Sequence, residues 1–301
     1  MKKTIHFIAG LPRSGSTLLC NLLAQNPRIQ TTSTSGIINI VNLVHDEWKN
    51  VFGTVDHPAA AADRKRVLEG IMQDYFDDDS TDDRPIVFDK SRGWLGQLWL
   101  AELALGRKVK VLVCVRDIRD VLASFEQLWR KNAGTWGQPQ EQGYYLDWQT
   151  VEGRCDVLMR QDQVVGGAYA RIKTALTRGA LDRMHFVEFE KMTANPRDTT
   201  RAIYEFLGEP LFAHDFENVE QVTWEDDFMH GIPGLHKIRQ NIKPVPPNWP
   251  RLLGNFANKY TPLNNLWRHA IDGYYVASPQ TPQEQQAVLQ GITGPGLSAP
   301  V

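Results

Sequence analysis

The chain has 301 residues, a formal net charge of −2, 42% hydrophobic residues and 23% charged residues, as is ordinary for a folded globular protein. This length allows one large α/β core, so we expect a single domain over residues 1–277 and a mobile or docked tail, rich in Gln, Pro and Gly, over 278–301. A charge near zero argues against nucleic acid or a sulfated glycan as a partner, because proteins that bind polyanions usually carry a basic excess.

The cysteines and the N-terminal segment give information about the cellular location of the protein. Cys20, Cys114 and Cys155 are odd in number and lack metal-ligand spacing, which favours small core residues in a reducing compartment over a disulfide framework or a metal site. Pro12 and Arg13 interrupt the apolar run that would otherwise imitate a signal peptide. No run approaches the roughly 20 apolar residues of a membrane span. The sequence therefore predicts a cytoplasmic protein without a membrane partner.

In chain order, predicted strands alternate with predicted helices. Short apolar or β-prone runs predict strands at residues 5–9, 85–88, 109–115 and 184–189. Apolar spacing predicts helices at 18–25, 37–49, 64–76, 94–103, 118–129, 154–177 and 195–207. Two segments read as loops, the hydroxyl-rich 31–36 and the aromatic-rich 132–150, and residues 215–250 show little periodicity. This order predicts a P-loop-type three-layer α/β/α fold around a mostly parallel sheet.

The segment Gly10 to Thr17, G-L-P-R-S-G-S-T, lies between the first strand and the first helix. A strand, a glycine turn and a helix N-terminus in this order aim backbone N–H groups and a positive dipole end at one point. The spacing is that of a P-loop, except that Ser16 replaces the lysine that reaches the phosphates of a nucleoside triphosphate. We therefore expect an oxyanion here, with the cationic role moved to Arg13; the other interpretation is a chance glycine turn.

A second candidate anion site begins where the strand 109–115 ends. Arg116 stands at the carboxyl end of that strand and Ser124 two turns into the next helix, at the edge where doubly wound sheets bind ligands. A cation and a hydroxyl so placed can close on one phosphate. A helix cap at Asp117 beside a surface arginine explains the same pattern about as well.

Together the two segments resemble the nucleotide-binding motifs of the sulfotransferase family, which uses 3′-phosphoadenosine 5′-phosphosulfate (PAPS) as donor. P-R-S-G-S-T-L-L at 12–19 is similar to the 5′-phosphosulfate loop, and Arg116 and Ser124 keep the spacing of the 3′-phosphate segment. Lys90 follows a short strand, as a lysine of the family does, and later landmarks are F-E-K-M at 189–192, Pro196 and F-L-G at 206–208. The resemblance covers about residues 4–210 and is nearest to tyrosylprotein sulfotransferases and their bacterial relatives.

The resemblance implies in-line transfer of a sulfuryl group from PAPS to a hydroxyl (or amine) acceptor on a small molecule or peptide, with PAP as product. It assigns the 5′-phosphosulfate to Arg13, Ser14, Gly15, Ser16 and Thr17. It assigns the 3′-phosphate to Arg116 and Ser124. Lys90, with Arg13, would neutralise charge that develops as the bond to the bridging oxygen breaks. Arg239, or Lys237 beside it, lies in a basic loop that the family returns over the nucleotide; a solvated loop is the other interpretation.

The acceptor hydroxyl also needs a general base, and here the chain departs from its relatives. Tyrosylprotein sulfotransferases place a glutamate just after the first helix, whereas residues 31–35 hold no carboxylate. The nearest titratable candidates in sequence are His45, Asp46 and Glu47, each of which can equally lie on a helix surface. An acceptor phenol of low pKa would need no strong base.

Two other functions stay open at this point. In a P-loop kinase or NTPase, Asp89 after the apolar run 86–88 would help hold Mg²⁺, although Ser16, Lys90 and the Arg116–Ser124 segment argue for PAPS. The third function is a catalytically silent nucleotide-binding module that works through its aromatic lid. The acceptor and the oligomeric state are not specified by the sequence.

Overall fold

The computed structural model describes residues 2–52, 58–77, 83–132, 144, 146–227 and 234–273. Five strands form one sheet in the order β2-β3-β1-β4-β5, and every neighbouring pair is parallel. The strands are β1 (Thr4–Gly10), β2 (Ile29–Thr34), β3 (Ile86–Lys90), β4 (Val111–Val115) and β5 (Met184–Glu188). The predicted α/β class with a mostly parallel sheet is confirmed.

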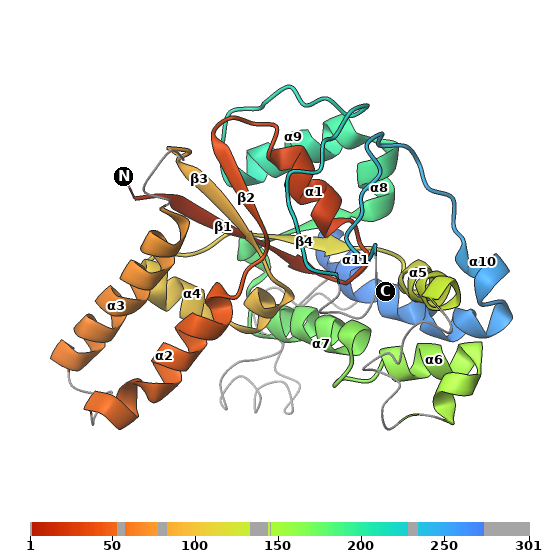
Figure 1. Ribbon diagram of the computed structural model, residues 1–301, viewed down its shortest axis with the longest axis horizontal. Coiled ribbons are helices and arrows are strands. Elements are labelled where there is room, and N and C mark those ends of the chain that lie inside the picture. The colour runs from red at the N-terminus through yellow and green to blue at the C-terminus, as the bar shows by residue number, and fades with distance from the viewer. Residues whose placement is uncertain are drawn as a thin grey trace, which may run out of the picture.

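Helices cover both faces of the sheet (Figure 1), because successive side chains of a strand point to opposite faces. Ile5 and Phe7 of β1 belong to one core cluster and Ile8 to the other. The first face is covered by α2 (Ile37–Phe52), α3 (Pro58–Phe76), α4 (Leu98–Leu105), α5 (Ile118–Asn132), α6 (Val151–Leu158), α7 (Val164–Thr177) and α11 (Asn265–Ile271). The second face is covered by α1 (Ser16–Leu23), α8 (Phe189–Ala194) and α9 (Pro196–Leu207).

The predicted loop 31–36 is wrong, because residues up to Thr34 belong to β2. This strand is at the edge of the sheet and pairs only with β3, so one side of it stays open to polar side chains. Threonine is β-branched and suits such a half-buried strand. The hydroxyl groups that favoured a loop prediction form hydrogen bonds within the fold instead. For example, Thr32 Oγ1 donates to Asp89 Oδ1 at 2.7 Å.

The single helix predicted at 154–177 is also wrong, because the chain turns between α6 and α7. Gly166 near the start of α7 lies so close to this turn that a Cβ there would be 2.1 Å from the carbonyl oxygen of Met159. Apolar spacing continues through the turn, so periodicity alone did not reveal it. The helix predicted at 94–103 likewise divides, into the 3-10 helix η1 (Arg92–Gly96) and α4.

The described residues of the segment, 215–227 and 234–248, form no helix or strand, as predicted, and α10 (Trp249–Leu252), the 3-10 helix η5 (Asn255–Asn264) and α11 follow. Two further 3-10 turns, η3 (Asp147–Gln149) and η4 (Leu181–Arg183), precede α6 and β5. Most of the predicted lid, 133–143 and residue 145, and the whole tail 278–301 lie outside the described residues. The three cysteines are free and buried, as expected.

Among the described helices, none is long and apolar enough to cross a membrane.

Candidate functional site

The loop between β1 and α1 is held against the end of β4. Gly10 has φ +124°, and a Cβ there would lie 2.0 Å from the carbonyl oxygen of Cys114, so only glycine fits. The N–H of Leu11 donates to the same carbonyl at 2.8 Å. Ser14 is fully buried, with Oγ 2.6 Å from the carbonyl oxygen of Leu11 and 3.1 Å from that of Cys114. The Ser14 hydroxyl therefore fixes the loop, which leaves its backbone N–H for a ligand.

The N-terminus of α1 is open to an anion. Gly15 precedes α1 with φ +84°, and a Cβ there would lie 2.7 Å from the ring of Phe189. The first turn of α1 carries no acidic residue and no side-chain cap. Its N–H groups have no intrahelical partner and its dipole is positive at this end. Arg13 is in the left-handed region, with φ +58°, a strained conformation that often marks a functional site.

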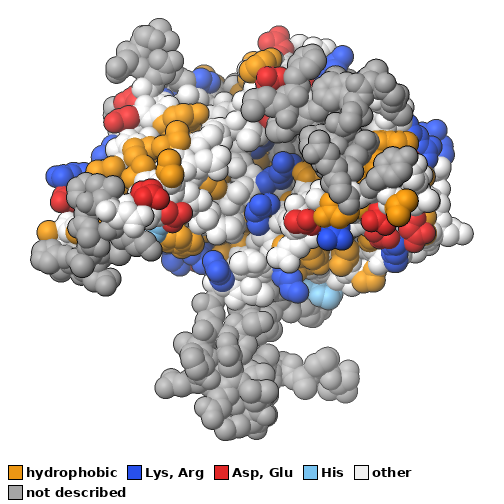
Figure 2. Space-filling view, turned by 60° about the horizontal axis from the view of Figure 1, so that its bottom comes forward, with side chains coloured by type: hydrophobic (Ala, Val, Ile, Leu, Met, Phe, Trp, Pro, Cys, Tyr) orange, Lys and Arg blue, Asp and Glu red, His pale blue; other side chains and the backbone are white. Residues whose placement is uncertain are grey.

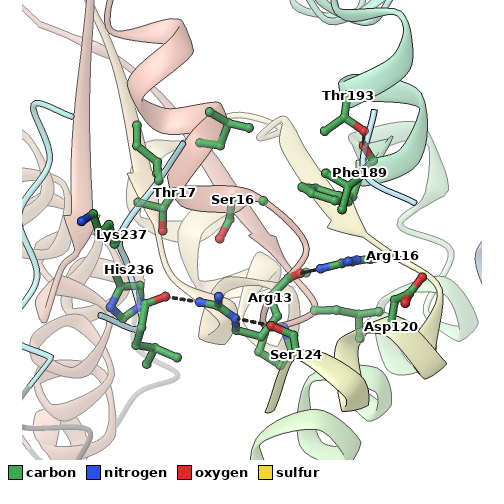
Figure 3. Close-up of a pocket in the computed structure, with 18 of the residues that line it drawn as sticks. Arg13, Ser16, Thr17, Arg116, Asp120, Ser124, Phe189, Thr193, His236 and Lys237 are labelled. Carbon is green, nitrogen blue, oxygen red and sulfur yellow. Dashed lines mark hydrogen bonds between the residues drawn. The ribbon is translucent and has the colours of Figure 1, made fainter. Parts of the chain in front are cut away.

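The guanidinium of Arg13 connects the two predicted anion sites (Figure 3). Its Nε donates to Ser124 Oγ at 3.0 Å, and its NH1 donates to the carbonyl oxygen of Leu235. Burial and the charge of Arg116 lower the pKa of Arg13 to about 10. The charge of Arg116 thus disfavours the charged form of Arg13, and an anionic ligand between them would relieve this repulsion.

Arg116 also points toward the loop (Figure 3). Its NH1 donates to the carbonyl oxygen of Arg13 at 3.2 Å, and its guanidinium lies over the Phe189 ring, 4.4 Å from the centroid. Burial lowers its pKa, with the charge of Arg239 acting in the same direction. Asp117 instead accepts from the side chain of Arg119 at 2.6 Å and from its backbone N–H at 2.9 Å. The capping interpretation was therefore right for Asp117 and wrong for Arg116, which is not a surface arginine.

One cavity of about 1010 Å³ joins these groups. Of the residues predicted to hold the donor or the leaving group, all except Ser14 line it: Arg13, Gly15, Ser16, Thr17, Lys90, Arg116, Ser124, Lys237 and Arg239. Figure 2 shows a face of the molecule on which Lys and Arg side chains gather in a central hollow. The volume is at the upper end of the range for small-molecule sites, large enough for a nucleotide together with a second substrate.

Lys90 takes part in a charged network that the sequence did not predict. Its side chain is 8% exposed; Nζ lies 3.3 Å from Thr17 Oγ1 and forms an ion pair with Glu225. His236 Nε2 lies 3.0 Å from the other oxygen of Glu225, and His236 Nδ1 lies 2.6 Å from Asp227 Oδ1. Glu225 and Asp227 come from the aperiodic segment, where the run W-E-D-D at 224–227 was the only signal.

Asp89 is not placed to hold Mg²⁺ beside the loop. It is fully buried, and its second oxygen, Oδ2, accepts from Trp94 Nε1 at 2.6 Å while Oδ1 accepts from Thr32. Burial raises the pKa of this carboxyl. Both oxygens are used within the fold, and Asp89 is not among the residues that line the cavity. This geometry disfavours the NTPase alternative.

The general-base candidates on α2 are also away from the cavity. His45, Asp46 and Glu47 are not among the described residues that line it. The His45 ring packs edge-on against Trp99, with 4.9 Å between centroids, and burial lowers its pKa. The geometry favours the helix-surface interpretation for these three residues.

Comparison with solved structures gives similar proteins of low sequence identity. The sulfotransferase domain of the Synechococcus PCC 7002 olefin synthase is 17% identical, with a TM-score of 0.52, over 89% of this chain and 96% of that one. A sulfotransferase from Alicyclobacillus acidocaldarius is 17% identical over the same shares, with a TM-score of 0.49. Mouse sulfotransferase SULT7A1, crystallised with PAP, is 14% identical over 96% of this chain and 90% of that one, with a TM-score of 0.49. The first likeness shows the fold. Curated proteins give no match.

The comparison with family models is more specific. The model described as the sulfotransferase family matches residues 6–214. This range runs from β1 to beyond α9 and contains both predicted anion sites and Lys90. The chain thus belongs to the sulfotransferase family, as a PAPS-dependent enzyme of the kind that its two motifs predicted.

Proposed function

We propose that this protein moves the sulfuryl group of PAPS to a hydroxyl (or amine) acceptor by in-line displacement. The N–H groups from Ser14 to Thr17, with Arg13, would hold the 5′-phosphosulfate. Arg116 and Ser124 would hold the 3′-phosphate, and Arg239 would close over the nucleotide. PAPS supplies the activated sulfuryl group, and the protein supplies position and charge.

The observation that carries this proposal is the joining of the two anion sites in one cavity. The Arg13 side chain, which starts in the loop, bonds to Ser124 at the second site. Ser124 Oγ accepts this bond and keeps its own hydrogen to donate to a phosphate oxygen. Arg13 and Arg116 are partly desolvated and close to each other, so a ligand with two anionic groups relieves a repulsion at both ends. A nucleotide phosphorylated at both positions has this charge pattern.

Lys90 is the candidate for stabilising the leaving group. Its Nζ lies beside Thr17 in the first turn of α1, where the phosphosulfate would sit. A cation there neutralises the negative charge that gathers on the bridging oxygen as its bond to sulfur breaks. The nearness to tyrosylprotein sulfotransferases stays a prediction, as does the acceptor, for which we propose a hydroxyl group on a small molecule or a peptide.

Calorimetric titration with PAP, PAPS, ATP and GTP tests the donor, and transfer of ³⁵S from PAPS into a panel of phenols, alcohols and amines tests the reaction. We expect tight binding of PAP and PAPS, weak binding of ATP and GTP, and labelled product with at least one acceptor. Preferred binding of ATP with Mg²⁺-dependent hydrolysis would contradict the proposal. PAP binding without turnover on any acceptor would favour a silent binding module.

A further inference from the structure

The carboxylate of Glu225 lies at the wall of the donor cavity, next to the cation assigned to the leaving group. One oxygen forms the ion pair with Lys90, whose Nζ also reaches Thr17 in the anion-binding loop. The other oxygen accepts from Thr34 Oγ1 at 2.9 Å and lies 3.0 Å from His236 Nε2. Glu225 thus stands one side chain away from the point where the sulfuryl group is held.

The surroundings of Glu225 keep it ionised. Its side chain is only 5% exposed, and burial by itself would raise its pKa. The charges of Lys90 and His236, with hydrogen bonds from Lys90 and Thr34, hold its pKa below the usual value. Burial lowers the pKa of Arg92 on η1, and the charge of Glu225 opposes this shift, so Arg92 is a further cation near the carboxylate. The carboxylate thus has donors or cations from β3, β2, η1 and the irregular segment around it, in Lys90, Thr34, Arg92 and His236.

One other carboxylate of the described residues lines the cavity, at the end assigned to the nucleotide. Asp120 also lines the cavity, but its Oδ1 accepts the backbone N–H groups of Asn248 and Trp249 at 2.8 and 3.1 Å. It lies on α5, in the turn below Ser124, at the nucleotide end. Glu225 is the carboxylate of the described wall that lies beside Lys90.

We propose that Glu225 is the group that takes the proton from the acceptor hydroxyl, in place of the glutamate that is missing after the first helix. This inference rests on the proposed function and adds the residue that completes it. The acceptor oxygen forms a bond to sulfur while the bond between sulfur and the bridging oxygen breaks. PAP leaves with that electron pair, the proton passes to a Glu225 oxygen, and it is released to water when the products depart.

The ion pair with Lys90 makes proton transfer to Glu225 depend on the donor being bound first. While Lys90 is bound to Glu225, the carboxylate is a weak base. A bound donor brings phosphate and sulfate oxygens to Thr17 and draws the charge of Lys90 toward them. The pKa of Glu225 then rises, so it becomes a better proton acceptor only when the donor is present.

Glu225→Gln tests the role with little change in size. We expect PAP affinity within about 2-fold of the wild type and a turnover loss of about 10²–10⁴-fold with phenols of ordinary pKa, the usual contribution of a general base. The loss should shrink steadily across a series of more acidic phenols, ending with 4-nitrophenol, because these give up the proton without help. Glu225→Asp should recover part of the turnover on the least acidic members of the series.

Glu220→Gln is the matched control, since Glu220 is an exposed carboxylate of the same segment and does not line the described cavity; its turnover and PAP affinity should match the wild type. A loss in Glu225→Gln that is equal for all phenols would overturn the proposal and leave Glu225 a structural partner of Lys90. A large loss of PAP affinity would overturn it in the same way.

A second measurement does not depend on turnover. 4-Nitrophenol bound to the complex of enzyme and PAP can be titrated by its absorbance. A neighbouring carboxylate raises the pKa of the bound phenol, so this pKa should fall when Glu225 is replaced by Gln. An unchanged pKa would overturn the assignment of Glu225 even if the wild-type enzyme transferred no sulfuryl group. Absence of transfer by the wild type would instead overturn the proposed function.

Discussion

The two sides of the cavity are built in different ways. The loop from Gly10 to Thr17 is fixed by the backbone, through the carbonyl of Cys114 and the start of α1. The opposite side comes from the irregular segment 215–250, where the N–H groups of Val222 and Thr223 donate to Asn21 Oδ1 on α1. Ion pairs between side chains then join Glu225, Asp227 and His236 to Lys90. The sheet and the start of α1 therefore fix the loop, whereas the charged groups around Lys90 are joined by ion pairs between side chains.

The sharpest test of this difference is a pair of glycine substitutions. Gly10→Ala places a Cβ 2.0 Å from a backbone oxygen at φ +124°, and we expect it to lower the free energy of unfolding by about 4 kcal/mol or more. Gly234→Ala, in the irregular segment at φ +76° with no atom within 4 Å, should lower it by only about 1 kcal/mol. Urea denaturation measures the free energy of unfolding of both variants. Equal decreases would contradict the difference between the loop and the irregular segment.

Removing Lys90 should affect chemistry rather than donor binding. We expect Lys90→Ala to lower turnover by about 10²–10³-fold, the effect of losing one stabilising donor at a developing negative charge, while PAP affinity is kept. Steady-state kinetics and calorimetry measure the two effects separately. Unchanged turnover would remove Lys90 from the mechanism.

Removing Arg116 should weaken donor binding, in contrast to the removal of Lys90, which should slow the chemical step. Arg116→Ala should weaken PAP binding by about 10–100-fold, because a charge-assisted hydrogen bond to the 3′-phosphate is lost. The control is Arg119→Ala, since Arg119 is paired with Asp117, lies 4.2 Å over the ring of Trp249 and does not line the described cavity. Equal loss of PAP binding in Arg116→Ala and Lys90→Ala would overturn the assignment of roles.

The smallest effect concerns acid stability of the charged network. Because the folded-state pKa of Glu225 is lowered, the carboxylate stabilises the fold above its ordinary pKa of about 4.3. This stabilisation is lost as the pH falls through the lower folded-state pKa. Urea denaturation from pH 7 to well below pH 4 should therefore show a steeper loss of the free energy of unfolding for the wild type than for Glu225→Gln, with the difference confined to the acid end. Parallel curves would mean that the network contributes nothing to stability.

The donor side of the site could be predicted because backbone rules apply to it. A buried strand, a glycine turn and a helix start are local patterns; Arg116 follows β4, and Lys90 is the last residue of β3. The carboxyl ends of parallel strands meet at one edge, so these groups were expected together. The Ser14 hydroxyl was not expected to bond within the loop, since its partners lie 3 and 100 residues away.

The side of the cavity that carries Glu225 could not be predicted, because backbone rules do not apply to it. Glu225 lies 135 residues from Lys90 in sequence, and no periodicity places the segment that carries it. Candidates chosen by nearness in sequence, such as His45, fell on α2 instead. The β2 strand was missed because a hydroxyl-rich sequence does not reveal pairing with a distant strand. The break between α6 and α7 was missed because the apolar spacing continues through the turn.

The carbonyl of Cys114 accepts from Leu11 and lies beside the Ser14 hydroxyl, one peptide before the strand that delivers Arg116 ends. The register of β1 against β4 therefore sets the spacing between Arg13 and Arg116, the two arginines that we assign to the phosphates. To accommodate a donor whose two anionic ends lie farther apart, β1 would have to shift its register against β4, because a substitution of side chains does not change that register.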